Sequence, residues 1–338
     1  MQFCGRCEER LDDWRNMIHL GDDAIEALLD LAGVTQVVGD AFVAWGRGEA
    51  DTTQRVCAST PNAMASAMAA VVPPFSGGKI YATTNGTFTF VNVLFDTEGH
   101  LLCTLAGDAL TAFRTPAACA LAIRTLCDAP SSPRTTAALV GAGRQGWYHL
   151  EMLAAELPGL HEVRIADLNP AAVATMVDRA CQAGIPATAA VSAASAVDGA
   201  DVIVTVTRST APLFPAEVVG NGALICAVGA TKYDRREIGA DVIARCATVV
   251  CDDVVGSRME CGDLIQAHRA GAFDWDRAVE LHAVLAETVF VEGAGRAPVL
   301  FETQGVALQD VAAAGLAWQR YNSHDFIRQN QHIRETTP

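Results

Sequence analysis

The pattern of apolar and polar positions changes character along the first third of the chain. Between residues 22 and 45, apolar side chains recur at helical spacing. Residues 63–95 are typical of strands, which we expect to break at Pro73-Pro74 and at Gly77-Gly78. The segment "DTEG" at 96–99 predicts a turn that joins the two strands of a hairpin.

A helix is predicted next, over residues 108–126, and the pattern then alternates between strands and helices. Continuous apolar runs of this kind are typical of strands that are covered on both faces, as in a parallel sheet with helices on each side. We expect five such strands, within 136–143, 162–168, 200–207, 222–230 and 247–253.

This order predicts an α/β fold with two domains. A doubly wound, Rossmann-type dinucleotide domain is expected over residues 126–299. Residues 1–125 and 300–338 are expected to form a second, α+β domain. In this prediction the strand and the long helix after Pro298 both return to the N-terminal part.

Composition narrows the functional class. The 338 residues are 51% hydrophobic and 6% aromatic, which suits a tightly packed α/β enzyme. A net charge of −15 argues against nucleic acid, whose phosphates need a basic face. We expect no membrane association, because no apolar run reaches the roughly 18–20 residues that a membrane helix requires. The polar N-terminus does not resemble a secretory signal, so a cytoplasmic location is expected.

The eleven cysteines are scattered and odd in number, which predicts reduced thiols that pack as small apolar side chains. Cys4 and Cys7 form a CxxC pair at the terminus. A zinc site would need a second pair at a comparable spacing, and the chain has none, so no metal site is predicted.

A glycine-rich loop, "GAGRQG" at 141–146, ends one apolar run and opens a helical pattern, the context that dinucleotide binding requires. The first glycine permits a tight turn, the second lets the backbone approach the pyrophosphate, and the third lets the helix pack on the strand. A turn of purely structural use is the alternative. We expect the cofactor to contact Gly141, Gly143, Arg144, Gln145 and Gly146.

An acid follows the next strand. Asp167 lies slightly beyond the usual interval of about 20 residues. Its carboxylate can accept ribose hydroxyls and repel a 2′-phosphate, which favours NAD over NADP. The alternative role for Asp167 is a helix N-cap, and Arg164 and Arg144 keep NADP possible.

Three basic residues before the loop stand in apolar or small-residue surroundings: Arg55, Lys79 and Arg114. An unpaired charge there is costly, so the three are expected to converge on one cleft and hold a carboxylate. Each can also be an ordinary surface ion-pair residue.

At this point the chain resembles the ornithine cyclodeaminase and mu-crystallin family, which includes ketimine reductases and certain alanine dehydrogenases. The resemblance spans about residues 20–320. It depends on "KIYATTNG", "LFDTEGHLL", "LTAFRTPAACALA", "LVGAGRQGWYHL", "DVIVTVTRSTAPLF", "AVGATKYDRREI", "CGDLIQA" and "ETQGVALQDVA".

The resemblance implies a homodimer in which the nucleotide domain is inserted into a substrate-binding and dimerisation domain, formed by residues 1–125 and 300–338. It also implies roles for individual residues. Lys79, Arg114 and Arg55 match carboxylate-binding positions, and Thr87 matches a substrate or cofactor contact. Thr207, Val228 and Gly305 match positions that line the nicotinamide half.

Two departures from the family pattern bear on the reaction. Cyclodeaminases carry an aspartate where this chain has Thr231, although Asp234 follows three residues later and can substitute for it. Thr303-Gln304 replaces the frequent Lys-Ser, and Gln304 is expected to shape the substrate pocket. Reduction of a preformed imine needs only a carboxylate clamp, a hydride and a proton donor, and Lys79 can be that donor.

We therefore predict an NAD(P)H-dependent oxidoreductase that acts on the C–N bond of an α-imino or α-amino acid. Lys79, Arg114 and Thr231 are its expected catalytic residues. An ornithine or lysine cyclodeaminase that recycles its NAD is the alternative enzyme. A crystallin-like protein that binds the dinucleotide without turnover is the alternative of another class.

Overall fold

The computed structural model describes residues 17–84, 87–127, 132, 135–291 and 295–323. The chain divides into two compact units. Unit 1 comprises residues 1–41, 49–114 and 307–338, and unit 2 comprises residues 42–48 and 115–306. The predicted domain boundaries at 125/126 and 299/300 stay predictions. The chain passes from one compact unit to the other at 114/115 and 306/307.

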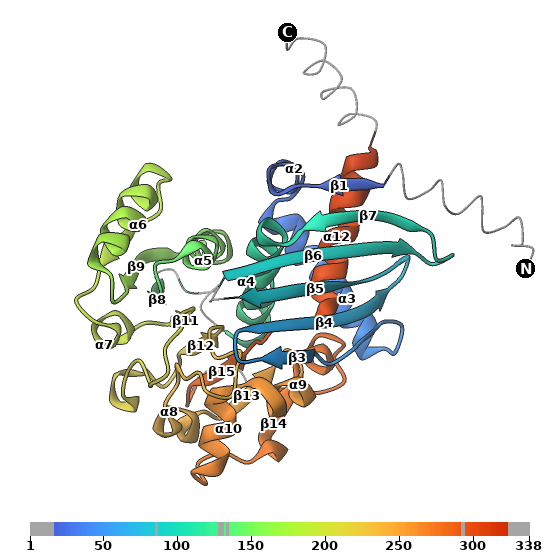
Figure 1. Ribbon diagram of the computed structural model, residues 1–338. Helices are drawn as coiled ribbons and strands as arrows, with labels where there is room; N and C mark the ends of the chain where they lie inside the picture. Colours follow the sequence, from blue (N-terminus) through green and yellow to red (C-terminus); the bar gives the residue numbers. More distant parts are fainter. Residues whose placement is uncertain (1–16, 85–86, 128–131, 133–134, 292–294, 324–338) are drawn as a thin grey trace, which may run out of the picture. The chain divides into compact units, whose positions relative to one another are not determined.

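Unit 1 contains one mixed sheet whose strand order is β1-β7-β6-β5-β4-β2, with β3 also paired to β4 (Figure 1). β1 runs parallel to β7 and the other pairs are antiparallel. The strands are β1 (Ile18–Leu20), β2 (Asp51–Thr52), β3 (Val56–Thr60), β4 (Ala63–Val72), β5 (Phe75–Thr84), β6 (Thr87–Asp96) and β7 (Leu101–Ala106).

The hairpin predicted at "DTEG" is present, because the Asp96 carboxylate accepts hydrogen bonds from the backbone N–H groups of Glu98 and His100. The break expected at Gly77-Gly78 was wrong, since β5 runs straight through it. A Cβ on Gly77 would lie 2.2 Å from the Val93 carbonyl oxygen. These glycines therefore permit close strand approach in the sheet and do not end the strand.

One face of this sheet is covered, and the other is open as far as the described residues are concerned. α12 packs along β4, β5 and β6. The open face consists mainly of alternate small or apolar residues, among which Val56 and Ile80 are 65% and 53% exposed. The helices that contribute to unit 1 are α2 (Asp22–Leu28), α3 (Leu31–Gly46), the first part of α4 (Gly107–Leu126) and α12 (Ala307–Asn322).

Unit 2 contains a parallel sheet with the order β10-β9-β8-β11-β12-β15-β13-β14. The chain starts in the middle at β8, winds outward through β9 and β10, and returns to build the other side, as in a doubly wound fold. Its strands are β8 (Thr135–Val140), β9 (Leu160–Ala166), β10 (Ala187–Ala189), β11 (Val202–Thr205), β12 (Leu224–Ala227), β13 (Thr248–Cys251), β14 (Ala278–Glu280) and β15 (Val299–Glu302).

β15 corrects the prediction for the C-terminal segment. Only α12 returns to the N-terminal part, whereas β15 lies between β12 and β13 of the parallel sheet. Its four residues are all buried, as a central strand of a doubly covered sheet requires.

The helices of unit 2 connect these strands. They are α5 (Arg144–Glu156), α6 (Pro170–Gln182), α7 (Ala193–Val197), α8 (Ala240–Arg245), α9 (Val254–Glu260), α10 (Gly262–Arg269) and α11 (Leu281–Leu285), with short 3-10 helices η3 (Ala216–Val218) and η4 (Trp275–Arg277).

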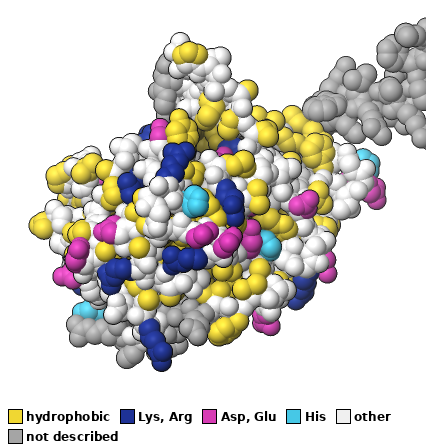
Figure 2. Space-filling model, turned by 90° about the horizontal axis from the view of Figure 1, so that it is seen from below, with side chains coloured by type: hydrophobic (Ala, Val, Ile, Leu, Met, Phe, Trp, Pro, Cys, Tyr) yellow, Lys and Arg dark blue, Asp and Glu magenta, His cyan; other side chains and the backbone are white. Residues whose placement is uncertain are grey.

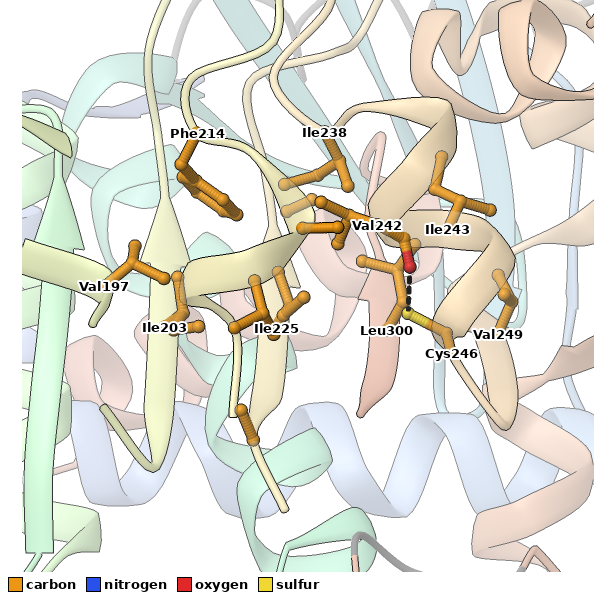
Figure 3. Close-up of a cluster of buried hydrophobic side chains, with 14 of the residues drawn as sticks. Val197, Ile203, Phe214, Ile225, Ile238, Val242, Ile243, Cys246, Val249 and Leu300 are labelled. Carbon is orange, nitrogen blue, oxygen red and sulfur yellow. Dashed lines mark hydrogen bonds between the residues drawn. The ribbon is translucent and has the colours of Figure 1, made fainter. Parts of the chain in front are cut away.

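The core of unit 2 lies against one part of the parallel sheet (Figure 3). Ile203, Ile225 and Leu300 come from three neighbouring strands and face Val242 and Ile243 of α8. Each fully buried side chain of this size contributes about 1.5–3 kcal/mol to folding. This burial holds the strand ends, and the loops that follow them, in fixed positions.

On the face shown in Figure 2, basic and acidic side chains are interspersed among apolar ones, so this face has no continuous basic area. Among the described helices none alone has the length and apolarity to cross a membrane, although the bent pair α2 and α3 meets those criteria when taken together.

Candidate functional site: a cationic clamp and a dinucleotide loop

Lys79 lies in the middle of β5 on the covered face of the unit 1 sheet, only 2% exposed. Its ammonium Nζ donates hydrogen bonds to Thr111 Oγ1 at 2.7 Å and to Asp310 Oδ1 at 3.2 Å. The Phe90 ring lies 4.7 Å from the same Nζ. The lysine is therefore held in place by α4, α12 and the neighbouring strand β6.

Arg114 reaches the same carboxylate from α4. Its Nε donates to Asp310 Oδ1 at 3.2 Å, and its Nη1 donates to Gln309 Oε1 at 2.9 Å. Arg55, half-buried between β2 and β3, is close enough for its charge to act on both Lys79 and Asp310. The structure thus brings together the three basic residues that the sequence singled out.

The electrostatics of this cluster favour a bound anion. Burial lowers the pKa of Lys79 to about 8, and the Asp310 carboxylate only partly offsets this effect. Burial opposes ionisation of Asp310, but the charges of Arg114 and Lys79 outweigh it and lower the pKa of that carboxyl. Lys79 and Arg114 share the single carboxylate of Asp310, and Arg55 lies near them, so the cluster is rich in cations and can hold a substrate carboxylate.

The glycine loop of unit 2 has the geometry that the sequence predicted. Gly141 adopts φ +121°, and a Cβ there would lie 2.5 Å from the Val206 carbonyl oxygen. A Cβ on Gly146 would lie 2.1 Å from the Gly141 carbonyl oxygen, which shows how closely helix and strand approach. Gly143 instead faces open space and has no side chain to cap α5. Arg144 and Gln145 open that helix, so its first N–H groups can bind a diphosphate.

Asp167 follows β9 and is tied to the loop, because its Oδ2 accepts a hydrogen bond from the Ala142 N–H at 2.8 Å. It is not the N-cap of α6. That role belongs to Asn169, whose Oδ1 accepts from two backbone N–H groups of the first turn. Arg164 donates to Glu162 and to the Asp198 carbonyl, so its guanidinium is already engaged.

Glu237 is a buried residue that the sequence reasoning missed. Its Oε1 accepts from the Thr207 N–H at 2.5 Å, and its Oε2 accepts from the Gly229 N–H at 2.7 Å and from Thr205 Oγ1 at 2.9 Å. One carboxylate therefore joins the ends of β11 and β12. Val228, which we predicted beside the nicotinamide, is the residue just before Gly229 and is buried.

Asp252, which follows β13, joins the ends of β13 and β15 in a similar way. It accepts from Thr303 Oγ1 at 2.6 Å, from the Gln304 N–H at 3.3 Å and from the Gly305 N–H at 2.8 Å. Gly305 has φ +81°. The loops that carry Thr207, Val228 and Gly305 thus follow the carboxyl ends of three adjacent strands, where ligands of doubly wound sheets bind.

The predicted role of Gln304 in shaping the substrate pocket is not supported by its surroundings. Its side-chain oxygen accepts from Ser257 Oγ at 2.6 Å, and its Nε2 lies 3.5 Å from Glu302 Oε2. The side chain is 7% exposed and is held inside unit 2.

Several buried carboxyl groups of unit 2 lie close enough to affect one another. Burial, and then the nearby Glu237, raise the pKa of Asp263 to about 8. Asp263 Oδ1 accepts from the backbone N–H groups of Glu237 and Ile238 at 2.7 and 3.0 Å. Burial also raises the pKa of Glu237 and Glu302. Asp263 thus supports the segment that positions Glu237.

The remaining predicted residues lie near loops. Thr231 is half-buried and its N–H donates to the Gly229 carbonyl, while Asp234 is exposed in the turn that follows. Thr87 is exposed at the start of β6. Cys4 and Cys7 lie outside the described residues. Within the described ranges, no group of three or more His, Cys, Asp or Glu side chains is arranged to hold a metal ion.

Unit 2 is a doubly wound sheet with a glycine loop at its central strand. Unit 1 carries the cationic clamp, which consists of Arg55, Lys79 and Arg114 around Asp310. Together these features define a dinucleotide-binding protein of the oxidoreductase type. The chain belongs to the ornithine cyclodeaminase/mu-crystallin family, whose model matches residues 16–325. The resemblance and the fold class predicted from the sequence are confirmed.

Similar proteins include two reductases. Delta(1)-pyrroline-2-carboxylate reductase 2 of Burkholderia ambifaria is 38% identical over 223 residues, which cover 65% of this chain and 66% of that protein. The Delta(1)-pyrroline-2-carboxylate/Delta(1)-piperideine-2-carboxylate reductase of Azospirillum brasilense is 32% identical over 305 residues, which cover 86% and 92%.

A solved structure shows the same fold. The Delta(1)-pyrroline-2-carboxylate reductase of Thermococcus litoralis, in complex with NADH and L-proline, matches with a TM-score of 0.85 at 23% identity. The match covers 91% of this chain and 98% of that one.

Proposed function

We propose that this protein is an NAD(P)H-dependent reductase of an α-imino acid. The observation that carries the proposal is the buried cluster of Lys79, Arg114 and Asp310, with Arg55 beside it, in a chain whose other unit has a dinucleotide loop. A carboxylate clamp and a hydride source are what reduction of a C=N bond beside a carboxylate requires.

In this reaction Arg114, Lys79 and Arg55 hold the α-carboxylate of the substrate. Arg114 has its Nε and Nη1 fixed by α12, so the guanidinium is already oriented before substrate binds. A nicotinamide, when bound, would supply the hydride for the imine carbon, and the nitrogen would take one proton, which would give the amine and the oxidised cofactor. Lys79, with a pKa of about 8, is protonated at neutral pH and can donate that proton.

The cofactor is NAD in preference to NADP. The Asp167 carboxylate stays beside the glycine loop through its bond to Ala142, and its oxygens keep lone pairs for ribose hydroxyls. Arg164 is engaged elsewhere, and Arg144 is the cation that keeps NADP possible. The first turn of α5 would hold the diphosphate, and the loops with Thr207, Val228 and Gly305 would line the nicotinamide.

The rival enzyme is an ornithine or lysine cyclodeaminase. It must first remove a proton from an amine whose pKa is near 10.4, so it needs a base beside that nitrogen. Thr231 occupies the position of the family aspartate, and a hydroxyl does not act as that base at neutral pH. Asp234 is exposed three residues on and is the only candidate replacement that we consider.

The assembly we propose is a cytoplasmic homodimer. The open face of the unit 1 sheet supports it, because exposed Val56, Val71 and Ile80 lie among alanines on that face. Light scattering of the purified protein tests the dimer. Val56→Lys together with Ile80→Lys should convert it to a monomer, and a wild-type monomer would contradict the proposal.

NADH consumption with a panel of cyclic and acyclic α-imino acids tests the reaction. We expect turnover of at least one imine and little ammonia release from ornithine or lysine. Ammonia release that Asp234→Asn abolishes would instead establish the cyclodeaminase. NADH binding without any turnover across the panel would establish a non-catalytic binding protein.

A further inference from the structure

Asp310 is the carboxylate that two cations of the clamp share. It lies on α12 and is 1% exposed. Its Oδ1 accepts hydrogen bonds from Lys79 Nζ and from Arg114 Nε, each at 3.2 Å. A buried ion pair of this kind adds little stability compared with apolar side chains of similar size. The value of Asp310 therefore lies in what it does to the two cations.

Opposing effects act on the charge of Lys79. Burial of the side chain favours the neutral amine, and the charges of Arg114 and Arg55 act in the same direction. The carboxylate of Asp310 acts in the opposite direction, both through its charge and through its hydrogen bond to Nζ. The pKa of Lys79, about 8, results from this balance.

The other contacts of Lys79 Nζ do not supply a compensating charge. Thr111 Oγ1 lies at 2.7 Å and the Phe90 ring at 4.7 Å, and both are uncharged. Among the described residues, Asp310 is thus the anion in contact with this ammonium. Without its carboxylate, burial and the neighbouring arginines would leave a neutral amine at pH 7.

The same oxygen also fixes where the two cations meet. Lys79 comes from β5 and Arg114 from α4, and both donate to Asp310 Oδ1. Arg114 has a second anchor, because its Nη1 donates to Gln309 Oε1 at 2.9 Å. Loss of the Asp310 charge should therefore affect Lys79 more than it affects the orientation of Arg114.

We propose that Asp310 is a positioning residue for the reduction, which keeps on Lys79 the proton that the imine nitrogen receives and which holds Lys79 and Arg114 at one point. In this reaction the imine carbon takes the hydride, the nitrogen takes the proton of Lys79, and water returns a proton to the neutral amine. The inference rests on the proposed imine reduction for its kinetic test. Its spectroscopic test depends only on the titration of Lys79.

Asp310→Asn removes the charge with little change in shape. The asparagine carbonyl oxygen can take the place of Oδ1 and accept from the same two donors. Its NH2 group then takes the place of Oδ2, which is buried without a hydrogen-bond partner among the described residues. The NH2 group therefore displaces no printed donor, and a change in behaviour reports the charge.

The kinetic test is the pH profile of kcat/KM for an α-imino acid, followed by NADH oxidation. In the wild type kcat/KM should decline as pH rises through about 8, because Lys79 loses its proton. In Asp310→Asn this decline should lie at least about 1 pH unit lower, since a nearby opposite charge changes a pKa by about 1–3. Asp310→Glu keeps the charge, so its decline should stay within about half a pH unit of the wild type even though kcat/KM itself falls. Identical profiles of the wild type and Asp310→Asn would overturn the inference.

Two control variants separate the charge from the geometry of the clamp. Gln309→Leu removes one hydrogen bond to Arg114 without changing a charge, so kcat/KM should fall while the pH of the decline stays the same. Asp30→Asn removes a carboxylate that pairs with Arg320 of the same helix at 2.6 Å, and it should change neither quantity. A profile that moves as far in Gln309→Leu as in Asp310→Asn would show that geometry sets it, and the inference would be wrong.

The titration of Lys79 can be followed without any turnover. The chain contains two lysines, Lys79 and the exposed Lys232, so carbon-13 labelling of the lysine ε-carbons gives two NMR signals that can be followed against pH. The Lys79 midpoint should lie near 8 in the wild type and at least about 1 pH unit lower in Asp310→Asn. The Lys232 signal is the internal control and should behave alike in both proteins.

The wild-type midpoint alone decides if Asp310→Asn does not fold. A buried lysine without a counter-ion titrates near pH 5–6, so a midpoint of about 8 supports the role of Asp310. A wild-type midpoint below about 7 would overturn it, because Lys79 would then carry no proton to donate at neutral pH. A midpoint that falls in Asp310→Asn, in a protein that reduces no imine, would support the control of Lys79 by Asp310 and remove the proposed reaction instead.

Discussion

Replacing Glu237 by glutamine tests whether one buried carboxylate positions the loops after β11 and β12. The carboxylate accepts three hydrogen bonds, from the N–H groups of Thr207 and Gly229 and from the hydroxyl of Thr205. Glutamine has a single acceptor oxygen. Its amide can donate to the Thr205 hydroxyl, but one backbone N–H, that of Gly229 or Thr207, is then left facing an amide donor.

The expected loss follows from that single unsatisfied group. A buried N–H without a partner costs about 1–3 kcal/mol. At roughly 2–4 °C for each kcal/mol, the thermal unfolding temperature should fall by about 2–12 °C. The backbone N–H groups in question belong to Thr207 and to Gly229, the residue after Val228. Thr207 and Val228 are predicted to line the nicotinamide, so we also expect the Kd for NADH to rise about 5-fold or more.

Calorimetry and a fluorescence titration with NADH measure the two quantities on the same preparations. Glu217→Gln, at an exposed position of η3, is the matched control and should change neither. A Glu237→Gln protein as stable as the wild type at pH 7 would refute the reasoning, because it would show that the carboxyl is already neutral there. Lower stability with an unchanged NADH affinity would restrict Glu237 to a structural role.

The other predictions concern the clamp, the cofactor and pH. Arg114→Lys keeps a charge but loses the two fixed donors, so kcat/KM for the imine should fall at least about 30-fold, from a loss of about 2–5 kcal/mol, with the Kd for NADH within twofold; a fully active variant would remove Arg114 from the site. Asp167→Ser should shift the ratio of kcat/KM for NADH and NADPH towards NADPH, and an unchanged ratio would show that Asp167 does not reach the ribose. Since the pKa of Lys79 is about 8, kcat/KM should decline as pH rises through 8, and the residual activity of Lys79→Arg should lack that decline. The pKa of Asp263 is raised from 3.8 to about 8, so the folded state keeps a proton that the unfolded state loses and stability falls between about pH 4 and 8. Asp263→Asn keeps the acceptor oxygen and should flatten that part of a plot of unfolding temperature against pH; an unaltered slope would mean that another group causes it.

The fold was predictable wherever a local pattern determined it. The "DTEG" hairpin depends on side-chain bonds within five residues, and the glycine loop depends on the tight spacing of Gly141 and Gly146. β15 was assigned to the wrong part because its partners, β12 and β13, lie far away in sequence. A buried strand gives no local sign of which sheet it joins.

The candidate site was predictable only in part, for a related reason. Lys79 and Arg114 stood out as cations among small and apolar residues. Their common partner Asp310 is also a charge inside an apolar helix, and that signal could have found it. Glu237 follows two arginines and looks like part of a solvated run. Its burial becomes evident only when the ends of β11 and β12 come together around it.

The division of unit 1 into three chain segments has a consequence for how the protein is synthesised. All described strands of the parallel sheet lie between Thr135 and Glu302, so they are synthesised before α12. Lys79 and Arg114, by contrast, wait for Asp310 on α12, and until then two cations face an apolar sheet without their counter-ion. A nascent chain stopped before Ala307 therefore contains every described strand of the parallel sheet but lacks Asp310, the common partner of Lys79 and Arg114. Chaperone capture and proteolysis during synthesis should accordingly fall on the segment that was made first.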